Sequence, residues 1–179
     1  MKHVIIILFG ILFLISCGKD EKAKLPKKVV KEPRVSTSVK ENKPKEKSVV
    51  EIDAEGVANV TITSNDGMRF DIRKFKVSVG QKVRLTLNHT GKLDKKIMGH
   101  NVVILKKGIK ASSFAVAAAA AKDNDYIPLG TSDVIAHTKM IGGGESSVIE
   151  FTAPEKGTYN YICSFPGHFA MMKGKLIVE

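Results

Sequence analysis

From about residue 56 to the C-terminus, hydrophobic and polar positions alternate in short runs with a period of two. Turn-forming residues such as Asn65-Asp66-Gly67 separate the runs. The runs that predict strands are 57–63, 75–79, 82–88, 102–105, 147–152, 158–163 and 173–178. Many short strands joined by turns predict an all-β protein, specifically a Greek-key β-sandwich.

One segment interrupts the strand pattern. Residues 111–122 read ASSFAVAAAAAK, and an alanine run favours helix because alanine has the highest intrinsic helix propensity. Ser112 or Ser113 is a suitable N-terminal capping residue for this helix. We therefore expect one helical insertion that lies across the sandwich.

The first 17 residues have the pattern of a secretory signal. Lys2 precedes an apolar stretch from Val4 to Ile15, which is shorter than the roughly 20 apolar residues that a membrane-spanning helix needs. The stretch ends in Leu-Ile-Ser-Cys, which resembles a bacterial lipobox. We expect residues 1–17 to be a lipoprotein signal peptide that ends at a lipidated Cys17, and acyl chains anchor such a protein to a membrane.

Residues 18–52 differ in composition from the rest of the chain. Residues 18–50 contain 11 Lys or Arg, 5 Asp or Glu and no aromatic side chain, so little apolar surface can offset the entropy lost on ordering. We expect a disordered lysine-rich tether over 18–52 and a folded domain over 53–179. Much of the formal net charge of +11 lies in the tether, because residues 51–179 carry 17 basic and 13 acidic side chains. No interleaving of basic and aromatic residues suggests nucleic-acid binding.

The expected domain contains one cysteine, Cys163, in the loop between its last two strands. If Cys17 carries lipid, Cys163 has no disulfide partner, and metal binding is one standard role for an unpaired thiol in an exported protein. The loop continues through His168 to Met172, so a thiolate, an imidazole and a thioether lie within ten residues. A second imidazole, His100, precedes an earlier strand.

This set of side chains favours copper over other metals. Two histidines and a thiolate in a plane, with a weak axial thioether, form a trigonal site suited to copper. Structural zinc prefers four strong cysteine or histidine ligands, and calcium or magnesium needs clustered oxygen donors, which this loop lacks. Core packing would explain the cysteine or the methionine taken alone, but not the joint spacing.

Three motifs, in order along the chain, carry a resemblance to azurin, a blue-copper protein of the cupredoxin family. They are MGHN at 98–101, DVIAHTKMIGGGE at 133–145 and YICSFPGHFAMMKG at 161–174. The resemblance extends over roughly residues 56–179 and implies a cupredoxin-like sandwich with one type 1 copper ion per chain.

The resemblance also implies the roles of individual residues. The equatorial ligands would be His100, Cys163 and His168, with Met172 axial and the backbone carbonyl of Gly99 on the opposite side. The residues whose backbone N–H groups point at the ligand sulfur would be Asn101 and Phe165. An apolar patch for docking redox partners would include Met68, Met98, Pro166 and Gly167.

The sequence departs from azurin at two places, and it contains two further histidines. No second cysteine in the domain provides a disulfide, and Val102-Val103 stands where a tryptophan follows MGHN in the family. His89 and His137 match family histidines that do not bind copper, so we interpret them as structural or pH-sensitive positions.

These observations predict an electron-transfer protein and not an enzyme. A copper oxidase or reductase needs a second, substrate-binding copper, and no further histidines are placed to hold one. The alternative is a copper storage or delivery module. We expect a monomer that exchanges electrons with redox proteins such as cytochromes or copper and haem reductases and oxidases. Its expected location is the bacterial cell envelope, lipid-anchored and periplasmic, with the cell surface as the other option.

Overall fold

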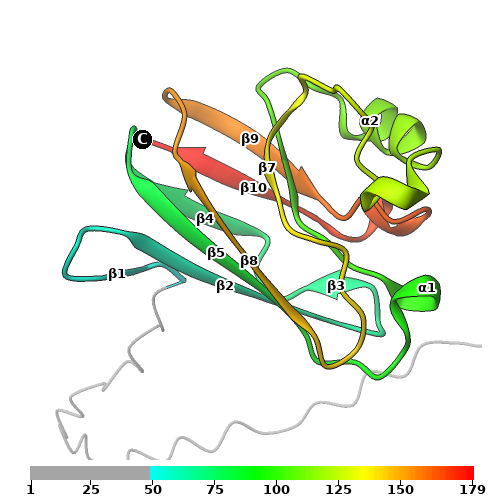
Figure 1. The fold of residues 1–179 in the computed structure, drawn as a ribbon. Coiled ribbons are helices and arrows are strands. Elements are labelled where there is room, and N and C mark those ends of the chain that lie inside the picture. Colours follow the sequence, from blue (N-terminus) through cyan, green and yellow to red (C-terminus); the bar gives the residue numbers. More distant parts are fainter. Residues whose placement is uncertain (1–48) are drawn as a thin grey trace, which may run out of the picture. The chain divides into compact units, whose positions relative to one another are not determined.

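Two five-stranded β-sheets pack face to face in the computed structural model, which describes residues 49–179 (Figure 1). The first sheet has the order β1-β2-β5-β8, with β3 beside β2. Its strands are β1 (Glu51–Ile52), β2 (Ala58–Asn65), β3 (Arg69–Phe70), β5 (Lys82–His89) and β8 (Ser146–Thr152). The second sheet, in spatial order, is β4 (Lys74–Val77), β10 (Lys173–Val178), β9 (Gly157–Ile162), β6 (Val103–Leu105) and β7 (Val134–His137). The predicted all-β sandwich is confirmed.

Alternation along the strands builds the core. Strands β2 and β5 run parallel, with Ala58 opposite Val83 and Ile62 opposite Leu87. Every second residue of both strands is buried, so these side chains line the inner face of the first sheet. Tyr161 and Leu176 from the second sheet belong to the same buried cluster. Each fully buried aliphatic side chain contributes about 1.5–3 kcal/mol.

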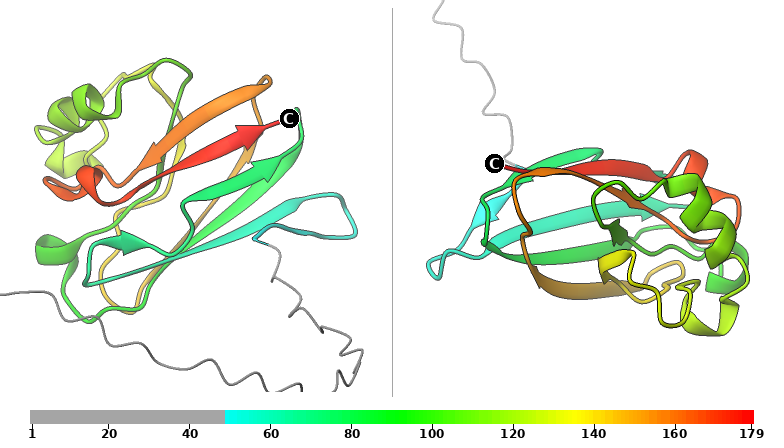
Figure 2. Two further views of the ribbon diagram at one scale, coloured as in Figure 1. Left: turned by 180° about the vertical axis from the view of Figure 1, so that it is seen from behind. Right: turned by 90° about the horizontal axis from the view of Figure 1, so that it is seen from above.

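The expected helical insertion is present but is shorter than the predicted segment 111–122. Helix α2 (Ala111–Ala118) lies outside the two sheets, and a short 3₁₀ turn, η1 (Lys122–Asn124), follows it (Figure 2). The predicted serine cap is wrong: Lys110 is the N-cap residue, and no side chain caps the helix. Phe114 and Ala118 bury the inner side of α2 against Ile162 of β9 in a second apolar cluster.

Several short elements were not predicted from the sequence. They are β1, β3, β7, helix α1 (Lys95–Met98) and the 3₁₀ turn η2 (His168–Ala170). Strand β1 begins at Glu51, inside the stretch that the composition assigned to the tether. The predicted signal peptide and almost all of the tether lie outside the described residues.

The two ends of the sandwich differ in character. Helices α1 and α2 and the turn η2 lie at one end, where β2 and β9 finish (Figures 1 and 2). Glu179 lies at the other end. It is close to Val50, since both residues line the same shallow surface depression. Within residues 49–179, no helix has the length and apolar character needed to span a membrane.

Candidate metal centre

Three side chains from two separate segments converge at the end of the sandwich that carries α1 and η2. One nitrogen from His100, one from His168 and the sulfur of Cys163 lie within 4.8 Å of one another. His100 follows α1 and is fixed by paired backbone hydrogen bonds of 2.9 Å with Ile141. Cys163 directly follows β9, and His168 opens η2. The fold therefore assembles one sulfur and two nitrogen donors.

The hydrogen bonds of His100 determine which of its nitrogens faces the other two donors. Its Nε2 lies 3.0 Å from the backbone carbonyl oxygen of Asn65. Because a carbonyl only accepts, Nε2 carries the proton and donates it. The Nδ1 of His100 is then an unprotonated nitrogen, and it is buried without any hydrogen-bond partner. Such a group costs about 1–3 kcal/mol unless something binds it.

Cys163 lies at the centre of the site and is fully buried. Its Sγ is 3.8 Å from the Gly99 carbonyl oxygen and 3.8 Å from His168 Nδ1. Burial raises the pKa of this thiol to about 12, although the backbone N–H groups of Asn101 and Phe165 act in the opposite direction. At neutral pH the thiolate therefore needs a cation beside it.

The residues present fit a copper ion. His100 offers a buried nitrogen that no group of the protein satisfies, and Cys163 offers a sulfur whose ionisation requires a cation. A thiolate with two imidazoles is a soft donor set that suits copper. Met172, whose side chain is fully buried, adjoins these donors because its carbonyl accepts the Cys163 N–H at 3.0 Å. Met171 instead is 44 % exposed.

Position 99 of the fold has room only for glycine. A Cβ atom there would clash with the Lys95 carbonyl oxygen and would lie 2.9 Å from Met140 Sδ and 3.0 Å from a ring carbon of Phe165. The absence of a side chain leaves room for these three neighbours, and the Gly99 carbonyl oxygen lies 3.8 Å from Cys163 Sγ. Gly99 thus links α1 to the donor cluster through backbone packing.

Asn101 connects the two donor-bearing segments. Its side-chain oxygen accepts the Ser164 N–H at 2.8 Å, and its Nδ2 donates to Ser164 Oγ at 2.8 Å. The same Nδ2 donates to the Asp125 carbonyl at 2.9 Å. Asn101 and Ser164 are both buried, so these bonds lie in a medium of low dielectric. The bonds hold the segments of His100 and Cys163 in one relative position.

Aromatic contacts join the helical insertion to the same loop. The ring of Phe165 lies 4.6 Å from the ring of His168, and Tyr126 meets Phe165 edge-on at 5.3 Å. Asp125 and Tyr126 both have positive φ angles, 52° and 57°, a conformation rare for residues with side chains. Phe169 packs into the cluster formed by α2. The insertion therefore has a structural role at the site, which the sequence did not indicate.

The residues of the predicted docking patch lie near this site in the chain or in space. Met68 is in the turn between β2 and β3, and its N–H donates to the same Asn65 carbonyl that His100 contacts. Met98 is half-buried at the end of α1, while Pro166 and Gly167 are exposed just before His168. Gly167 has a φ of +84°, which favours glycine at this bend.

Other site residues were not identified from the sequence. Asn65 acts through its backbone carbonyl, which no side-chain pattern reveals, and Ser164 acts through its bonds to Asn101.

His89 stacks on His100 at a ring distance of 4.3 Å, and both its nitrogens have backbone partners, Met98 O and Gly91 N. His137 is exposed on β7, away from the donor cluster.

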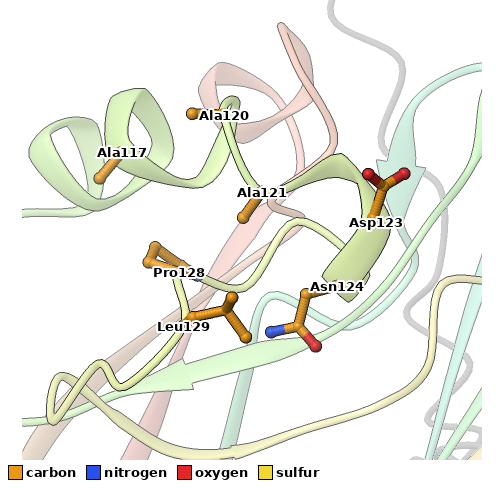
Figure 3. Close-up of a pocket in the computed structure, with 7 residues that line it drawn as sticks. All are labelled: Ala117, Ala120, Ala121, Asp123, Asn124, Pro128 and Leu129. Atoms are coloured by element: carbon orange, nitrogen blue, oxygen red, sulfur yellow. The ribbon is translucent and has the colours of Figure 1, made fainter.

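Another concavity of residues 49–179 lies beside α2. It has a volume of about 490 Å³ and lies between the end of α2 and the segment around Pro128 (Figure 3). Three of its seven lining residues are alanines, and Asp123 is the one charged side chain among them. No set of converging donors lies there, so the cluster at Cys163 is the chemical centre of residues 49–179.

The metal-free protein should lose stability below pH 6.5. Burial lowers the pKa of His100 to about 4 and also lowers the pKa of His168. In the unfolded chain these rings bind protons near pH 6.5, whereas the folded rings stay neutral, so protons favour unfolding between pH 6.5 and 4. We expect the free energy of unfolding to fall by about 2 kcal/mol for His100 between pH 7 and pH 4.5. Denaturant unfolding at several pH values measures this decline in the free energy of unfolding. The decline should be weaker in His100→Gln than in the unsubstituted protein, and an equal decline in the two proteins would contradict the prediction.

The sandwich and its buried sulfur–nitrogen donor set define a class: proteins that bind copper in a β-sandwich domain. Residues 34–179 match the family model of copper-binding proteins described as the plastocyanin/azurin family. The chain belongs to this family, and its cofactor is copper.

Individual relatives agree with that assignment. Azurin-1 of Alcaligenes xylosoxydans xylosoxydans is 44 % identical over 122 residues, which cover 66 % of this chain and 95 % of the relative. Outer membrane protein H.8 of Neisseria gonorrhoeae is 42 % identical over 125 residues, covering 68 % of this chain and 67 % of that protein. The solved structure of auracyanin A, a blue copper protein of Chloroflexus aurantiacus, has a TM-score of 0.64 at 33 % identity and covers 69 % of this chain and 100 % of its own. The resemblance to azurin inferred from the sequence is confirmed.

Proposed function

We propose that this protein carries single electrons between redox proteins of the bacterial cell envelope. His100, Cys163, His168 and Met172 would hold the copper ion, and the Gly99 carbonyl would be a further, weaker contact. Blue-copper electron transfer is the general activity that membership of the plastocyanin/azurin family supports. The partners are redox proteins such as cytochromes or copper and haem reductases and oxidases.

One observation carries the proposal: the donors are assembled and enclosed by the fold itself. His100 and Cys163 have no exposed surface, and His168 is 4 % exposed. Copper supplies a one-electron couple, Cu(II)/Cu(I). Asn101, Asn65 and Ile141 hold the donor segments by hydrogen bonds, so the donors need little movement when the charge of the site changes.

The same burial argues against the alternative of copper delivery. A delivery protein exchanges its metal through exposed ligands, whereas Cys163 and His100 are reached only through protein. An enzymatic role would need a substrate-binding centre, and the donor cluster of residues 49–179 is one site with enclosed ligands. Electron transfer requires neither metal exchange nor substrate entry.

The visible absorption spectrum tests the function. Protein that begins at residue 18 is loaded with Cu(II), its spectrum is recorded, and ascorbate is added. We expect an intense band in the red region that disappears on reduction and returns on reoxidation. A colourless copper-loaded protein, or rapid loss of copper to a mild chelator, would instead favour storage or delivery.

Replacing the axial ligand should change the potential and keep the colour. Met172→Leu conserves volume in a buried position, so the free energy of unfolding should change by less than about 1.5 kcal/mol. Removing a weak thioether donor destabilises the oxidised site more than the reduced site, so the reduction potential should rise. Voltammetry measures the shift, and Met171→Leu is the matched control because Met171 is exposed. An unchanged potential in Met172→Leu contradicts the axial role.

We further propose that Cys17 is lipidated and that residues 18–52 form the tether between anchor and domain. The lipobox-like residues before Cys17 support this, as does the similarity to outer membrane protein H.8. Lipidated cysteines hold proteins at a membrane, which places the domain in the envelope, on the periplasmic side or at the cell surface.

Metabolic labelling tests the anchor. We expect cells that express the full chain to incorporate labelled palmitate into the protein and retain it in the membrane fraction. Cys17→Ser should abolish both effects, while the visible spectrum stays the same. Equal labelling of the two proteins would exclude Cys17 as the lipid site. Protease treatment of intact cells then separates a surface domain, which is cleaved, from a periplasmic one.

A further inference from the structure

The outer face of the second sheet divides into a covered part and an uncovered part. Over β6 and β9 the helix α2 covers it, because Val103, Leu105 and Ile162 pack in one cluster with the buried side of that helix. Over β4 and β10, no helix of residues 49–179 lies on it (Figure 2). We name this uncovered part the β4–β10 face. Four exposed lysines stand on it: Lys74, Lys76, Lys173 and Lys175.

Alternation along the two strands places these lysines on one side of the sheet. Exposed lysines alternate with buried residues such as Phe75 in β4, and Lys175 of β10 is followed by the buried Leu176. The two strands run parallel, and their register sets Lys175 directly beside Lys74. Like charges on neighbouring strands repel each other, so an anion bound at this face would relieve a local repulsion.

The β4–β10 face keeps a net positive charge after its carboxylate is counted. Glu179 pairs with Lys76 at 2.9 Å, but both side chains are more than half exposed, so the pair is weak. Lys175 donates to the side-chain oxygen of Asn160, which is uncharged. Among residues 49–179, no carboxylate oxygen lies within 4.0 Å of the ammonium groups of the other two lysines. Four cations thus face one carboxylate side chain.

The cations on the outer face of the first sheet are matched by carboxylates. Lys82 and Arg84 of β5 both pair with Glu150 of β8, at 3.1 and 2.8 Å. Arg84 also lies 3.8 Å from Asp53. These four charges cancel, whereas those of the β4–β10 face do not. An anionic surface would therefore turn the β4–β10 face toward itself.

The chain that leads from Cys17 enters the domain at this same face. Val49 lies against Lys74, Phe75 and Lys76, because all four residues line one surface depression. The side chain of Val49 is 43 % exposed. Residues 18–48 join Cys17 to Val49, and a fully extended chain of that length spans up to about 100 Å. The domain can therefore reach the surface of a bilayer in which Cys17 is anchored.

We propose that the β4–β10 face lies on the anionic headgroups of the membrane that holds the Cys17 anchor. Acidic phospholipids supply the negative charge that attracts the lysines, and Val49 adds an apolar contact at the headgroup boundary. The strands then run along the bilayer, and the end with α1 and η2 faces sideways, toward redox proteins held at the same membrane. The inference rests on the lipid anchor proposed above and goes beyond it, because an anchor on a tether sets no orientation of the domain.

Binding to lipid vesicles tests the face without the anchor. The copper-loaded protein that begins at residue 18 lacks Cys17 and is sedimented with vesicles that contain phosphatidylglycerol, or with vesicles of phosphatidylcholine alone. The test variant is Lys74→Gln/Lys173→Gln/Lys175→Gln. The matched control, Lys92→Gln/Lys95→Gln/Lys96→Gln, loses the same three charges from exposed positions around α1. Both variants keep residues 18–48, so the lysines of that segment contribute equally to the two measurements.

We expect the test variant to bind the phosphatidylglycerol vesicles about tenfold more weakly than the control, because each lysine near an anionic surface strengthens binding. The difference should vanish at high salt, where charges are screened, and with phosphatidylcholine alone. Equal binding of the two variants would overturn the proposal. Weaker binding of the control would also overturn it, because the end with α1 would then be the side that contacts lipid.

Fluorescence quenching reads the orientation of the lipidated full chain on vesicles. A label on Thr158→Cys lies on β9, beside the β4–β10 face, and a label on Thr61→Cys lies on the outer face of the first sheet; both positions are exposed. We expect quenchers attached to the headgroups to dim the label at position 158 severalfold more than the label at position 61. Equal dimming would contradict the proposed orientation.

Failure of the earlier proposals gives different results. Without a lipid anchor the full chain would incorporate no palmitate, yet the vesicle test would still report on the lysines. Without the electron-transfer site the copper-loaded protein would lack a reversible blue band, and vesicle binding would be unaffected.

Discussion

Cys163→Ser should abolish the intense visible colour of the copper-loaded protein. The colour of such a site depends on a bond between copper and a thiolate sulfur, and Cys163 provides the one thiol of residues 49–179. A buried serine hydroxyl ionises far less readily than a thiol and is a harder donor. Removing a group that only hydrogen-bonds to a metal ligand typically lowers metal affinity by about 10–100-fold. Removing the ligand Cys163 itself should lower copper affinity by more than that.

The second cysteine of the chain provides the control for this experiment. Cys17→Ser removes a thiol without touching the domain, so its spectrum should match that of the unsubstituted protein. Circular dichroism of Cys163→Ser should still show the β-sandwich, because serine is nearly isosteric with cysteine. A Cys163→Ser protein that keeps a strong red band would show that the sulfur of Cys163 is not a ligand.

Asn101→Leu should cause a large loss of stability. It removes the bonds from the Asn101 amide and leaves the buried Ser164 N–H and the Asp125 carbonyl without partners. Each unsatisfied buried polar group costs about 1–3 kcal/mol, so we expect a total loss of about 3–4 kcal/mol. That is a large fraction of the 5–15 kcal/mol that stabilises a typical domain.

A smaller change at the same contact should cause a smaller loss of stability. Ser164→Ala removes only the hydroxyl and keeps the bond from the Ser164 N–H to Asn101, so a loss of about 1 kcal/mol is expected. Urea unfolding of the metal-free proteins gives the stabilities, and the rate of copper release should follow the same order. If Asn101→Leu is as stable as Ser164→Ala, the side chain of Asn101 does not hold the two segments together.

The long strands could be predicted from the sequence because their burial depends on their own alternation. In β2 and β5 every second side chain enters the core, so the pattern is visible in the chain itself. Strand β7 lacks that signal because none of its residues is fully buried. Helix α1 is a single turn of four residues, too short for helical periodicity to appear. The serine cap was wrong because α2 begins at Ala111, one residue before Ser112.

At the site, the sequence indicated residues that act through chemically distinctive side chains. The spacing of Cys163, His168 and Met172 pointed to one loop, and His100, just before an earlier strand, provided the second imidazole. The resemblance to azurin added the backbone carbonyl of Gly99. The partners that orient these donors were not visible, because Asn65 and Asp125 act through backbone carbonyls. The contact between Tyr126 and Phe165 depends on how the insertion folds back, which no local pattern encodes.

The separation of the two ends of the sandwich gives the domain a direction when it is immobilised. The chain enters the described domain near Val50, beside Glu179, while α1 lies at the opposite end (Figure 1). An electrode or bead attached upstream of residue 49 would leave the α1 and η2 end facing the solution, open to soluble redox reagents. Coupling through the lysines of α1 would reverse that orientation and place the donor cluster against the support. The point of attachment therefore decides whether the donor cluster exchanges electrons with soluble reagents or directly with the support.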